Sequence, residues 1–362
     1  MNLDKKFWSS KKVLITGNTG FKGTWLTKIL LELNARVIGY SDKEFNFSKY
    51  ESDHSNKSFT QIYADVNNII KLKNIVIKYR PQIIFHLAAQ SLVYKSYTNP
   101  YETFSTNSIG TLNILEITKK YSFIKTSIIV TSDKCYKPIL SKKYFDENSS
   151  LGGNDPYSAS KAISEIMTLS YIKSFPKINV ASVRAGNVIG GGDWSKKRLF
   201  PDLMRLVYDN KKLKIRNLSS VRPWQHVLEP LSGYLLLAEK LYNEKSKETS
   251  IYRGGFNFGP SAKNHKNVKM LIKMLENNLE KKIIFDLDDN KFHEEKAIFL
   301  NSNKSKKMLK WYTNFSLEDS ISFTHSWYKN FYIKKKQIKN YTQLQIRKYF
   351  KLLDEHKKNK YK

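Results

Sequence analysis

The sequence predicts an α/β protein in which a doubly wound parallel sheet carries a smaller α/β lobe. Short apolar runs of strand length recur along the chain, at residues 12–17, 35–40, 83–89, 127–132 and 178–190. Stretches with helical spacing, such as 101–121 and 157–174, separate these runs. Strands and helices that alternate in this way are typical of βαβ units in a parallel sheet.

The chain of 362 residues is long enough for a main domain and a second lobe. The regular alternation ends near Gly190, after which Gly, Trp, Pro and Arg become frequent. We therefore expect a main domain at 1–186 to which 223–248 returns, a smaller lobe mainly at 187–330, and a basic helical extension at 331–362. That extension is expected to pack on the surface, in preference to anchoring a membrane or a nucleic acid.

Composition removes several classes of protein from consideration. No run of 18 apolar residues is present, and Met1 to Lys12 lack the apolar stretch of a secretion signal, so we expect a cytoplasmic protein with no membrane partner. The single cysteine, Cys135, allows no internal disulfide. The seven histidines show no metal-ligand spacing, and no metal is expected.

The net charge of +31 is a feature that nucleic-acid-binding proteins share. Only nine of the 63 basic residues are arginines, however, and no binding motif accompanies the charge. We therefore interpret the lysines as solvated surface and expect no nucleic-acid partner. Six arginines fall close together, which favours bidentate phosphate binding there: Arg184, Arg198, Arg205, Arg216, Arg222 and Arg253.

The segment LITGNTGFKG places three glycines, Gly17, Gly20 and Gly23, between an apolar run and a helical stretch. Such glycines allow a tight turn and the close approach of a pyrophosphate to the helix N-terminus. A glycine triplet alone also occurs in ordinary turns, but the order strand, turn, helix and strand favours a Rossmann-type NAD-binding domain over 1–186. The expected cofactor contacts are Gly17, Asn18, Thr19, Gly20, Phe21, Lys22 and Gly23.

Acidic residues further along the chain are candidates to contact the ribose and the adenine of a dinucleotide. Asp42 can accept hydrogen bonds from a ribose 2′-hydroxyl, which favours NAD, whereas the neighbouring Ser41 and Lys43 leave NADP open. Asp65 and Val66 suit the adenine, although a surface acid is the alternative at Asp65.

Two further segments, TSDKCY (131–136) and DPYSASK (155–161), carry groups able to move protons. Tyr157 and Lys161 are one helical turn apart, and Asp155 followed by a proline marks the helix start. A tyrosine with a pKa of about 10 becomes a useful base only if that pKa falls by roughly three units. The Lys161 ammonium and a nicotinamide ring can supply this, and Ser132 can bind the same substrate hydroxyl. A Tyr-x-x-x-Lys pair alone also occurs by chance on amphipathic surfaces.

The glycine turn, HLAAQ (86–90), Asn107 and Tyr157-x-x-x-Lys161 together resemble the extended short-chain dehydrogenase/reductase family. Longer stretches resemble its CDP-glucose 4,6-dehydratase branch, and they span the chain apart from the basic extension: TGNTGFKGTWL (16–26), TSDKCY (131–136), RAGNVIGGGDW (184–194), RPWQHVLEPLSGYL (222–235), FNFGP (256–260) and HEEKAIFLNSNKSKKMLKW (293–311). The resemblance also implies cofactor contacts at Leu87, Ala88, Ala89, Tyr157 and Lys161, and a homodimer.

The resemblance implies conversion of CDP-glucose to CDP-4-dehydro-6-deoxyglucose. Tyr157 would take the proton of the sugar 4-hydroxyl as the C4 hydride passes to NAD, and the hydride would return to C6 once water is lost across C5 and C6. Asp133 would protonate the leaving 6-hydroxyl. Lys134 would take the C5 proton or, alternatively, bind the ketone oxygen as a cation.

Substrate contacts are expected at Gln90, Asn187, Arg198, Arg222 and His226. For the arginines the alternative is structural pairing with Asp193, Asp202 or Glu229. Asn18 and Tyr94 depart from the family pattern, in which His and Arg are common at these places. Alternative functions are a dehydratase or epimerase acting on another nucleotide sugar, or a non-catalytic protein that binds NAD or nucleic acid.

Overall fold

The computed structural model describes residues 3–44, 56–139, 144–209, 213–215, 217–244, 249–280, 282–287, 299–334 and 337–358. Arg216 and residues 293–298, which the sequence analysis used, lie outside the described residues.

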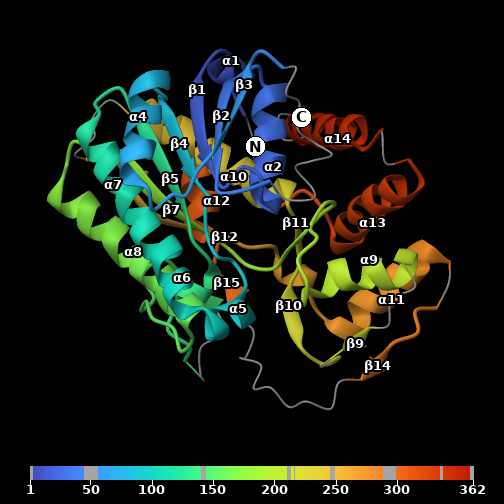
Figure 1. Ribbon diagram of the computed structural model, residues 1–362. Coiled ribbons are helices and arrows are strands. Elements are labelled where there is room, and N and C mark those ends of the chain that lie inside the picture. Colours follow the sequence, from blue (N-terminus) through green and yellow to red (C-terminus); the bar gives the residue numbers. More distant parts are fainter. Residues whose placement is uncertain are drawn as a thin grey trace.

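Seven parallel strands form the central sheet in the order β12-β7-β5-β4-β1-β2-β3 (Figure 1). Their bounds are β1 (Lys12–Thr16), β2 (Arg36–Ser41), β3 (Phe59–Tyr63), β4 (Ile83–His86), β5 (Thr126–Val130), β7 (Val180–Ala185) and β12 (Gly254–Phe258). The predicted doubly wound parallel sheet is confirmed. The edge strand β12, which pairs with β7, lies in the range assigned mainly to the smaller lobe, so that lobe is less continuous in sequence than expected.

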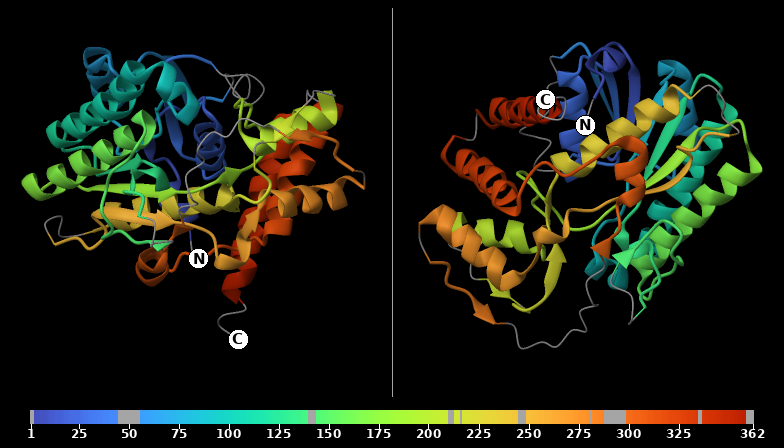
Figure 2. Two further views of the ribbon diagram at one scale, coloured as in Figure 1. Left: turned by 90° about the horizontal axis from the view of Figure 1, so that it is seen from below. Right: turned by 180° about the vertical axis from the view of Figure 1, so that it is seen from behind.

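Helices cover both faces of the sheet because successive apolar side chains of each strand point to opposite faces. Val13 and Ile15 belong to one core cluster and Leu14 to the other. On the first face lie α2 (Phe21–Glu32) and α10 (Leu228–Tyr242), and on the second lie α4 (Ile69–Tyr79) and α7 (Gly110–Lys120) (Figure 2). Since α10 contacts β5, β7 and β12, it packs on the main sheet, as expected for part of 223–248.

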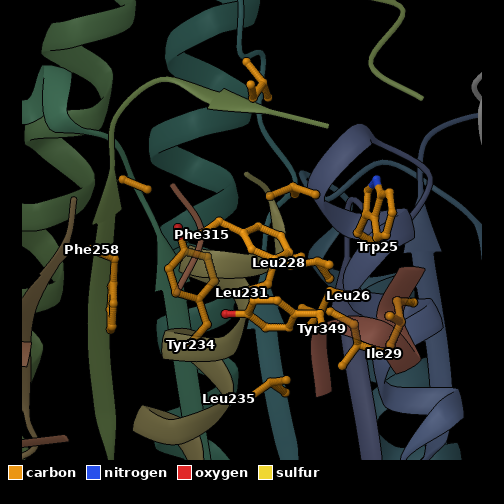
Figure 3. Packing of buried hydrophobic residues seen from close by; sticks show 14 of the residues in the cluster. Trp25, Leu26, Ile29, Leu228, Leu231, Tyr234, Leu235, Phe258, Phe315 and Tyr349 are labelled. Atoms are coloured by element: carbon orange, nitrogen blue, oxygen red, sulfur yellow. The ribbon is translucent and has the colours of Figure 1, made fainter. Parts of the chain in front are cut away.

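The core on the first face joins segments that are distant in sequence. Leu228, Leu231 and Leu235 of α10 lie beside Leu26 and Ile29 of α2 (Figure 3). Aromatic rings from the last third of the chain pack in the same cluster. Burial of this continuous apolar surface is the main force that fixes α10 on the sheet.

The second helical layer holds the segments nearest to the candidate site. It contains α5 (Val93–Thr98), α6 (Pro100–Phe104), the π-helix η1 (Ser105–Ile109) and α8 (Pro156–Ser174). The helical stretch predicted at 101–121 is present but is interrupted by the π-turn of η1, a feature common at functional sites. Asp155 caps α8 as predicted, since its Oδ1 accepts from Ser158 N at 3.0 Å.

The smaller lobe lies beside the carboxyl ends of the strands (Figure 1). It contains α9 (Leu199–Asp209), η3 (Ala262–Asn264), α11 (Val268–Leu279) and two short strand pairs, β10 (Val221–Pro223) with β13 (His265–Asn267), and β9 (Lys214–Ile215) with β14 (Asp286–Leu287). The remaining short elements are α1 (Lys5–Trp8), η2 (Asp133–Cys135), β6 (Tyr144–Phe145) with β15 (Phe299–Leu300), and β8 (Val188–Ile189) with β11 (Gln225–His226).

Three helices complete the chain: α12 (Asn303–Leu309), α13 (Leu317–Ile333) and α14 (Ile338–Lys358). The helix α14 belongs to the basic extension and packs against α13 and α2. Arg347 donates to both carboxylate oxygens of Glu32 on α2, at 2.7 and 3.1 Å. The extension is thus attached to the main domain. In the parts of the chain that the structure describes, no helix is long and apolar enough to cross a membrane.

Candidate active site

A pocket of about 1180 Å³ lies where the carboxyl ends of β1, β4, β5 and β7 face the smaller lobe. In the sheet order, β1 lies between β2 and β4, so the order in which successive strands are added reverses there, and the connections on either side leave a crevice above the strand ends. The glycine turn, the end of β5 and the start of α8 line one side. Residues 192–202 and β10 line the other.

The glycine turn is shaped for a close backbone approach. Gly17 has a φ of +71°, and a Cβ there would come within 2.6 Å of the backbone nitrogen of Ala88. A Cβ on Gly23 would lie 2.1 Å from the carbonyl oxygen of Gly17. Gly20 is the N-cap of α2 and offers no side-chain cap to the first N–H groups of the helix. These N–H groups and the helix dipole fit an anionic diphosphate.

Asn18 lies behind this turn, outside the pocket lining. Its Nδ2 donates to Gln61 Oε1 at 2.6 Å, and its Oδ1 accepts from the Ser41 hydroxyl at 2.9 Å. The structure therefore places Asn18 as a tie between the turn and strands β2 and β3, and the predicted direct cofactor contact finds no support. The other predicted turn residues, Thr19 to Lys22 among them, line the pocket.

The expected ribose and adenine contacts lie along the same wall. Asp42 and Lys43 line the pocket as an exposed ion pair, with 3.6 Å between Oδ2 and Nζ. Asp65 and Val66 line it further along, and Asp65 Oδ1 accepts from the backbone nitrogen of Asn67 at 2.9 Å. Leu87, Ala88 and Ala89 complete the cofactor side.

The two proton-carrying segments meet in this pocket. Ser132, Asp133 and Lys134 at the end of β5 line it together with Tyr157 and Lys161 of α8. The Ser132 hydroxyl donates to Asp133 Oδ1 at 2.9 Å and accepts from the backbone nitrogen of Lys134 at 3.2 Å. The fold thus brings together all five predicted catalytic residues.

The proton affinity of Tyr157 differs from the expectation. Burial raises its pKa to about 12, while a hydrogen bond from Ser132 and the positive charge of Arg198 act in the opposite direction. Lys161 is not among the main influences on this balance, and its Nζ donates to the carbonyl oxygen of Val130 at 3.3 Å. Burial also lowers the pKa of Lys161 itself to about 8. The protein surroundings of Tyr157 alone therefore do not make it a base.

Two neighbouring groups are also shifted by burial. The pKa of Asp133 is raised, chiefly by burial, although Lys134 and Ser132 oppose the shift. A raised pKa favours the protonated carboxyl that an acid catalyst needs. Burial and the nearby Arg198 lower the pKa of Lys22 to about 8.

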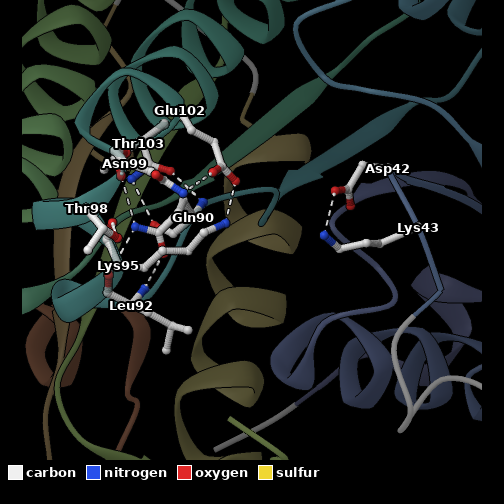
Figure 4. A network of polar contacts seen from close by, with 10 residues as sticks. Asp42, Lys43, Gln90, Leu92, Lys95, Thr98, Asn99, Glu102 and Thr103 are labelled. Atoms are coloured by element: carbon white, nitrogen blue, oxygen red, sulfur yellow. Dashed lines mark hydrogen bonds and ion pairs between the residues drawn. The ribbon is translucent and has the colours of Figure 1, made fainter. Parts of the chain in front are cut away.

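Gln90 lines the pocket, but its side-chain amide already has protein partners. Its Nε2 donates to the carbonyl oxygen of Leu92 and to Thr103 Oγ1, both at 3.0 Å, and its Oε1 accepts from Leu92 N at 2.7 Å (Figure 4). Asn107 Oδ1 accepts from the backbone nitrogen of Gln90 at 2.8 Å. Gln90 therefore shapes the pocket wall, because both N–H groups of its amide and one acceptor site of its Oε1 already have protein partners.

Three of the predicted substrate residues, Asn187, Arg198 and Arg222, line the pocket on the side of the smaller lobe. Arg198 Nη1 also pairs with Asp193 at 3.0 Å, the structural alternative considered for it. Nearby, the Lys197 ammonium lies 4.5 Å from the ring centroid of Tyr94, so this departure from the family pattern links the two sides of the pocket.

His226 is the predicted substrate residue that the pocket lining excludes. It is fully buried on β11, and its ring lies 5.8 Å from that of Trp25 and 5.5 Å from that of Phe315. Burial lowers its pKa to about 3, so the ring stays neutral. The structure thus assigns His226 to the core beneath α2.

Comparison with known proteins identifies the family. A family model described as GDP-mannose 4,6 dehydratase matches residues 14–324. The chain belongs to this dehydratase family. It is 40% identical over 337 residues to CDP-glucose 4,6-dehydratase of Salmonella typhimurium, covering 90% of this chain and 93% of that protein. It is 28% identical to dTDP-D-glucose 4,6-dehydratase of Dictyostelium discoideum, covering 88% and 82%.

Solved structures show that the fold is shared with dehydratases and epimerases. A dTDP-glucose 4,6-dehydratase from Bacillus anthracis in complex with NAD superposes with a TM-score of 0.75, at 23% identity, and covers 89% of this chain and 97% of that one. A UDP-glucose 4-epimerase from Thermotoga maritima with UDP-glucose gives a TM-score of 0.77 at 21% identity, covering 88% and 99%.

In this member of the dehydratase family, the clustered arginines have mixed roles. Within the described residues, Arg184 pairs with Glu165 and Arg205 with Asp202, and these two arginines and Arg253 lie outside the pocket lining. The phosphate argument therefore applies to Arg198 and Arg222, which line the pocket, although Arg198 also pairs with Asp193. Sequence reasoning also missed pocket residues in the loop after Gly190, namely Asp193, Trp194, Ser195, Lys196 and Lys197. The dense run of charged and aromatic residues in this Gly-rich loop was the available signal.

Proposed function

We propose that the chain is a CDP-glucose 4,6-dehydratase that forms CDP-4-dehydro-6-deoxyglucose. The supporting observation is that one pocket holds a diphosphate-shaped glycine turn together with Tyr157, Asp133 and Lys134. An epimerase needs no acid for a 6-hydroxyl, so a buried carboxyl beside Tyr157 favours dehydration. The 40% identical Salmonella typhimurium relative supports CDP-glucose as the substrate.

NAD is the cofactor that this wall fits best. The turn from Gly17 to Gly23 would hold the diphosphate, and the Asp42 carboxylate would accept from ribose hydroxyls. Lys43 beside Asp42 keeps NADP as the alternative. When bound, the nicotinamide would supply a reversible acceptor for a hydride of the sugar, so that no net oxidation would result.

The chain's own groups manage the protons. Tyr157 accepts the proton of the 4-hydroxyl, assisted by the hydrogen bond from Ser132 and the charge of Arg198. The carboxyl of Asp133 then gives its proton to the departing 6-hydroxyl, which leaves as water. Loss of the C5 proton supplies the electron pair for the new C5–C6 double bond. Lys134 is the proposed acceptor of the C5 proton, and the alternative is that it holds the ketone oxygen as a cation.

On the opposite wall, Arg198 and Arg222 are proposed to hold the substrate diphosphate, with Asn187 beside them. A homodimer is also proposed. Exposed apolar side chains of α8, Ile163 and Ile166, mark a face that a second copy would cover. Analytical ultracentrifugation distinguishes this dimer from a monomer.

The proposal is tested by incubating the protein with CDP-glucose, dTDP-glucose, UDP-glucose and GDP-mannose and measuring the 4-keto-6-deoxy product. We expect the highest kcat/KM with CDP-glucose. Faster turnover of another nucleotide sugar would show that the nucleotide assigned to the substrate, CDP, is wrong. A C4 epimer in place of a keto sugar would show that the reaction class is wrong.

A further inference from the structure

A buried ion pair lies directly beneath the catalytic residues. Glu165 is on α8, one turn beyond Lys161, and its Oε2 is 2.6 Å from Nη2 of Arg184 on β7. The two side chains are 0% and 1% exposed. Neither residue of the pair is part of the pocket lining.

Glu165 also binds the sheet through two hydroxyls. Thr131 at the end of β5 donates its hydroxyl hydrogen bond to Glu165 Oε1, and Ser182 of β7 donates to Oε2 at 2.6 Å. One carboxylate therefore joins the helix that carries Tyr157 and Lys161 to two adjacent strands.

Arg184 holds the other end of the same catalytic segment. Its Nη1 donates to the Tyr136 hydroxyl at 2.6 Å, and this hydroxyl donates to Asn257 Oδ1 of β12 at 2.8 Å. A Cβ at Gly255 would lie 2.5 Å from Arg184 Nη2, so glycine at this place leaves room for the guanidinium. Thr131 and Tyr136 flank residues 132–134. The ion pair thus hydrogen-bonds to this segment before and after its catalytic residues.

The charge of Glu165 acts on Lys161. Burial lowers the pKa of Lys161, and the negative charge of Glu165 opposes that shift. Burial by itself would raise the pKa of Glu165, but Arg184 and the hydrogen bonds outweigh it and hold that pKa below its ordinary value. Glu165 is therefore ionised at neutral pH.

Groups from other elements also face Lys161. His86 of β4 is neutral because burial lowers its pKa to about 3, and burial keeps Cys135 of η2 a thiol by raising its pKa. Lys22 of α2 is a second cation, and the charge of Lys161 lowers its pKa by repulsion. Glu165 is thus the anion among these facing groups that favours the charged form of Lys161.

We infer that Glu165 and Arg184 are positioning residues, which hold the Ser132-Asp133-Lys134 segment against α8 and keep Lys161 charged. A buried ion pair is weak evidence for stability, because well-packed apolar replacements are often at least as stable. Its value here lies in placement, since small displacements of reacting groups reduce rates on the order of 10²-fold. The inference rests on the proposed function.

The test compares Glu165→Gln with the wild type over a range of pH. Without the carboxylate, burial lowers the pKa of Lys161 further, so Lys161 loses its charge at a lower pH than in the wild type. We expect the alkaline limb of kcat to move to lower pH and kcat at pH 8 to fall about tenfold or more, with KM for CDP-glucose changed little. NAD affinity, measured by calorimetry, should weaken over the same pH range.

The matched control is Glu229→Gln on α10. Glu229 is also a fully buried acid, although burial raises its pKa to about 7. It accepts from the backbone nitrogens of Asn314 and Phe315 at 2.9 and 2.8 Å, and it lies outside the pocket lining. This variant should leave the pH profile in place. If Glu165→Gln fails to fold, the double variant Glu165→Gln, Arg184→Met removes both charges and avoids an unpaired buried cation.

The double variant should fold and still show the displaced alkaline limb. It restores neither the hydrogen bonds that hold residues 132–134 nor the charge beside Lys161. A wild-type pH profile and kcat in either folded variant would overturn the inference while leaving the dehydratase assignment intact. If the wild type forms no keto sugar, the proposed function fails. The calorimetric comparison then still decides the role of Glu165, because unchanged NAD affinity across pH in Glu165→Gln would overturn it.

Discussion

Individual side chains set the chemistry of this site chiefly through their burial. Burial raises the pKa of Asp133, which suits an acid, and it raises that of Tyr157 to about 12, which does not suit a base. Tyr157 therefore depends on its neighbours and on the bound cofactor. Lys161 is not among the main influences on the pKa of Tyr157, although the helical spacing suggested that it would be.

Lys134→Ala tests the proposed acceptor of the C5 proton. In deuterated water the variant should lose incorporation of solvent deuterium at C5 of the 4-keto sugar, as measured by mass spectrometry. Lys137→Ala, which alters an exposed lysine outside the pocket lining, should leave incorporation unchanged. Retained exchange in Lys134→Ala would exclude the base role and favour binding of the ketone oxygen.

Sequence spacing is most informative where local structure fixes the direction of a side chain. Tyr157 and Lys161 share a helix whose start Asp155 fixes, so their common orientation follows from spacing. Asn18 was included because it lies within the glycine turn, and His226 because it is close to Arg222 in sequence. Position along the chain does not say which way a side chain points. His226 instead fills an aromatic enclosure formed by residues far away along the chain.

Among the elements, the glycine turn carries the sharpest geometric requirement. Gly17→Ala adds a Cβ 2.6 Å from a backbone atom at a positive φ, so the turn must move. We expect loss of NAD binding in calorimetry and a lower Tm. Gly20→Ala is the matched control for Tm, because its Cβ meets only the Gly17 carbonyl at 3.4 Å. An unchanged Tm and NAD affinity in Gly17→Ala would contradict this description of the turn.

Element prediction depended on how continuous each apolar run is. Strands β1, β4 and β5 read clearly because most residues of these doubly covered strands are apolar. Strand β12 has the sequence GGFNF, which resembles a loop, and its burial comes from pairing with β7 and from Arg184 filling the space above Gly255. Such long-range causes cannot be read from a local window.

At the scale of the whole molecule, the pocket lies where the main domain and the smaller lobe face each other. The main domain supplies the cofactor wall and the smaller lobe supplies Arg198 and Arg222. The basic extension also contacts the main domain, because Arg347 of α14 pairs with Glu32 of α2. The contact between the two lobes depends on side chains that no motif marks.

The central claim is that one pocket oxidises C4, removes water and reduces C6 without releasing the cofactor. Conversion of CDP-glucose carrying deuterium at C4 tests it most directly, with the label located by NMR in the product. The account predicts a 4-keto-6-deoxy sugar with deuterium at C6 and no accumulation of NADH. Deuterium that remains at C4, or appears in free NADH, would contradict it.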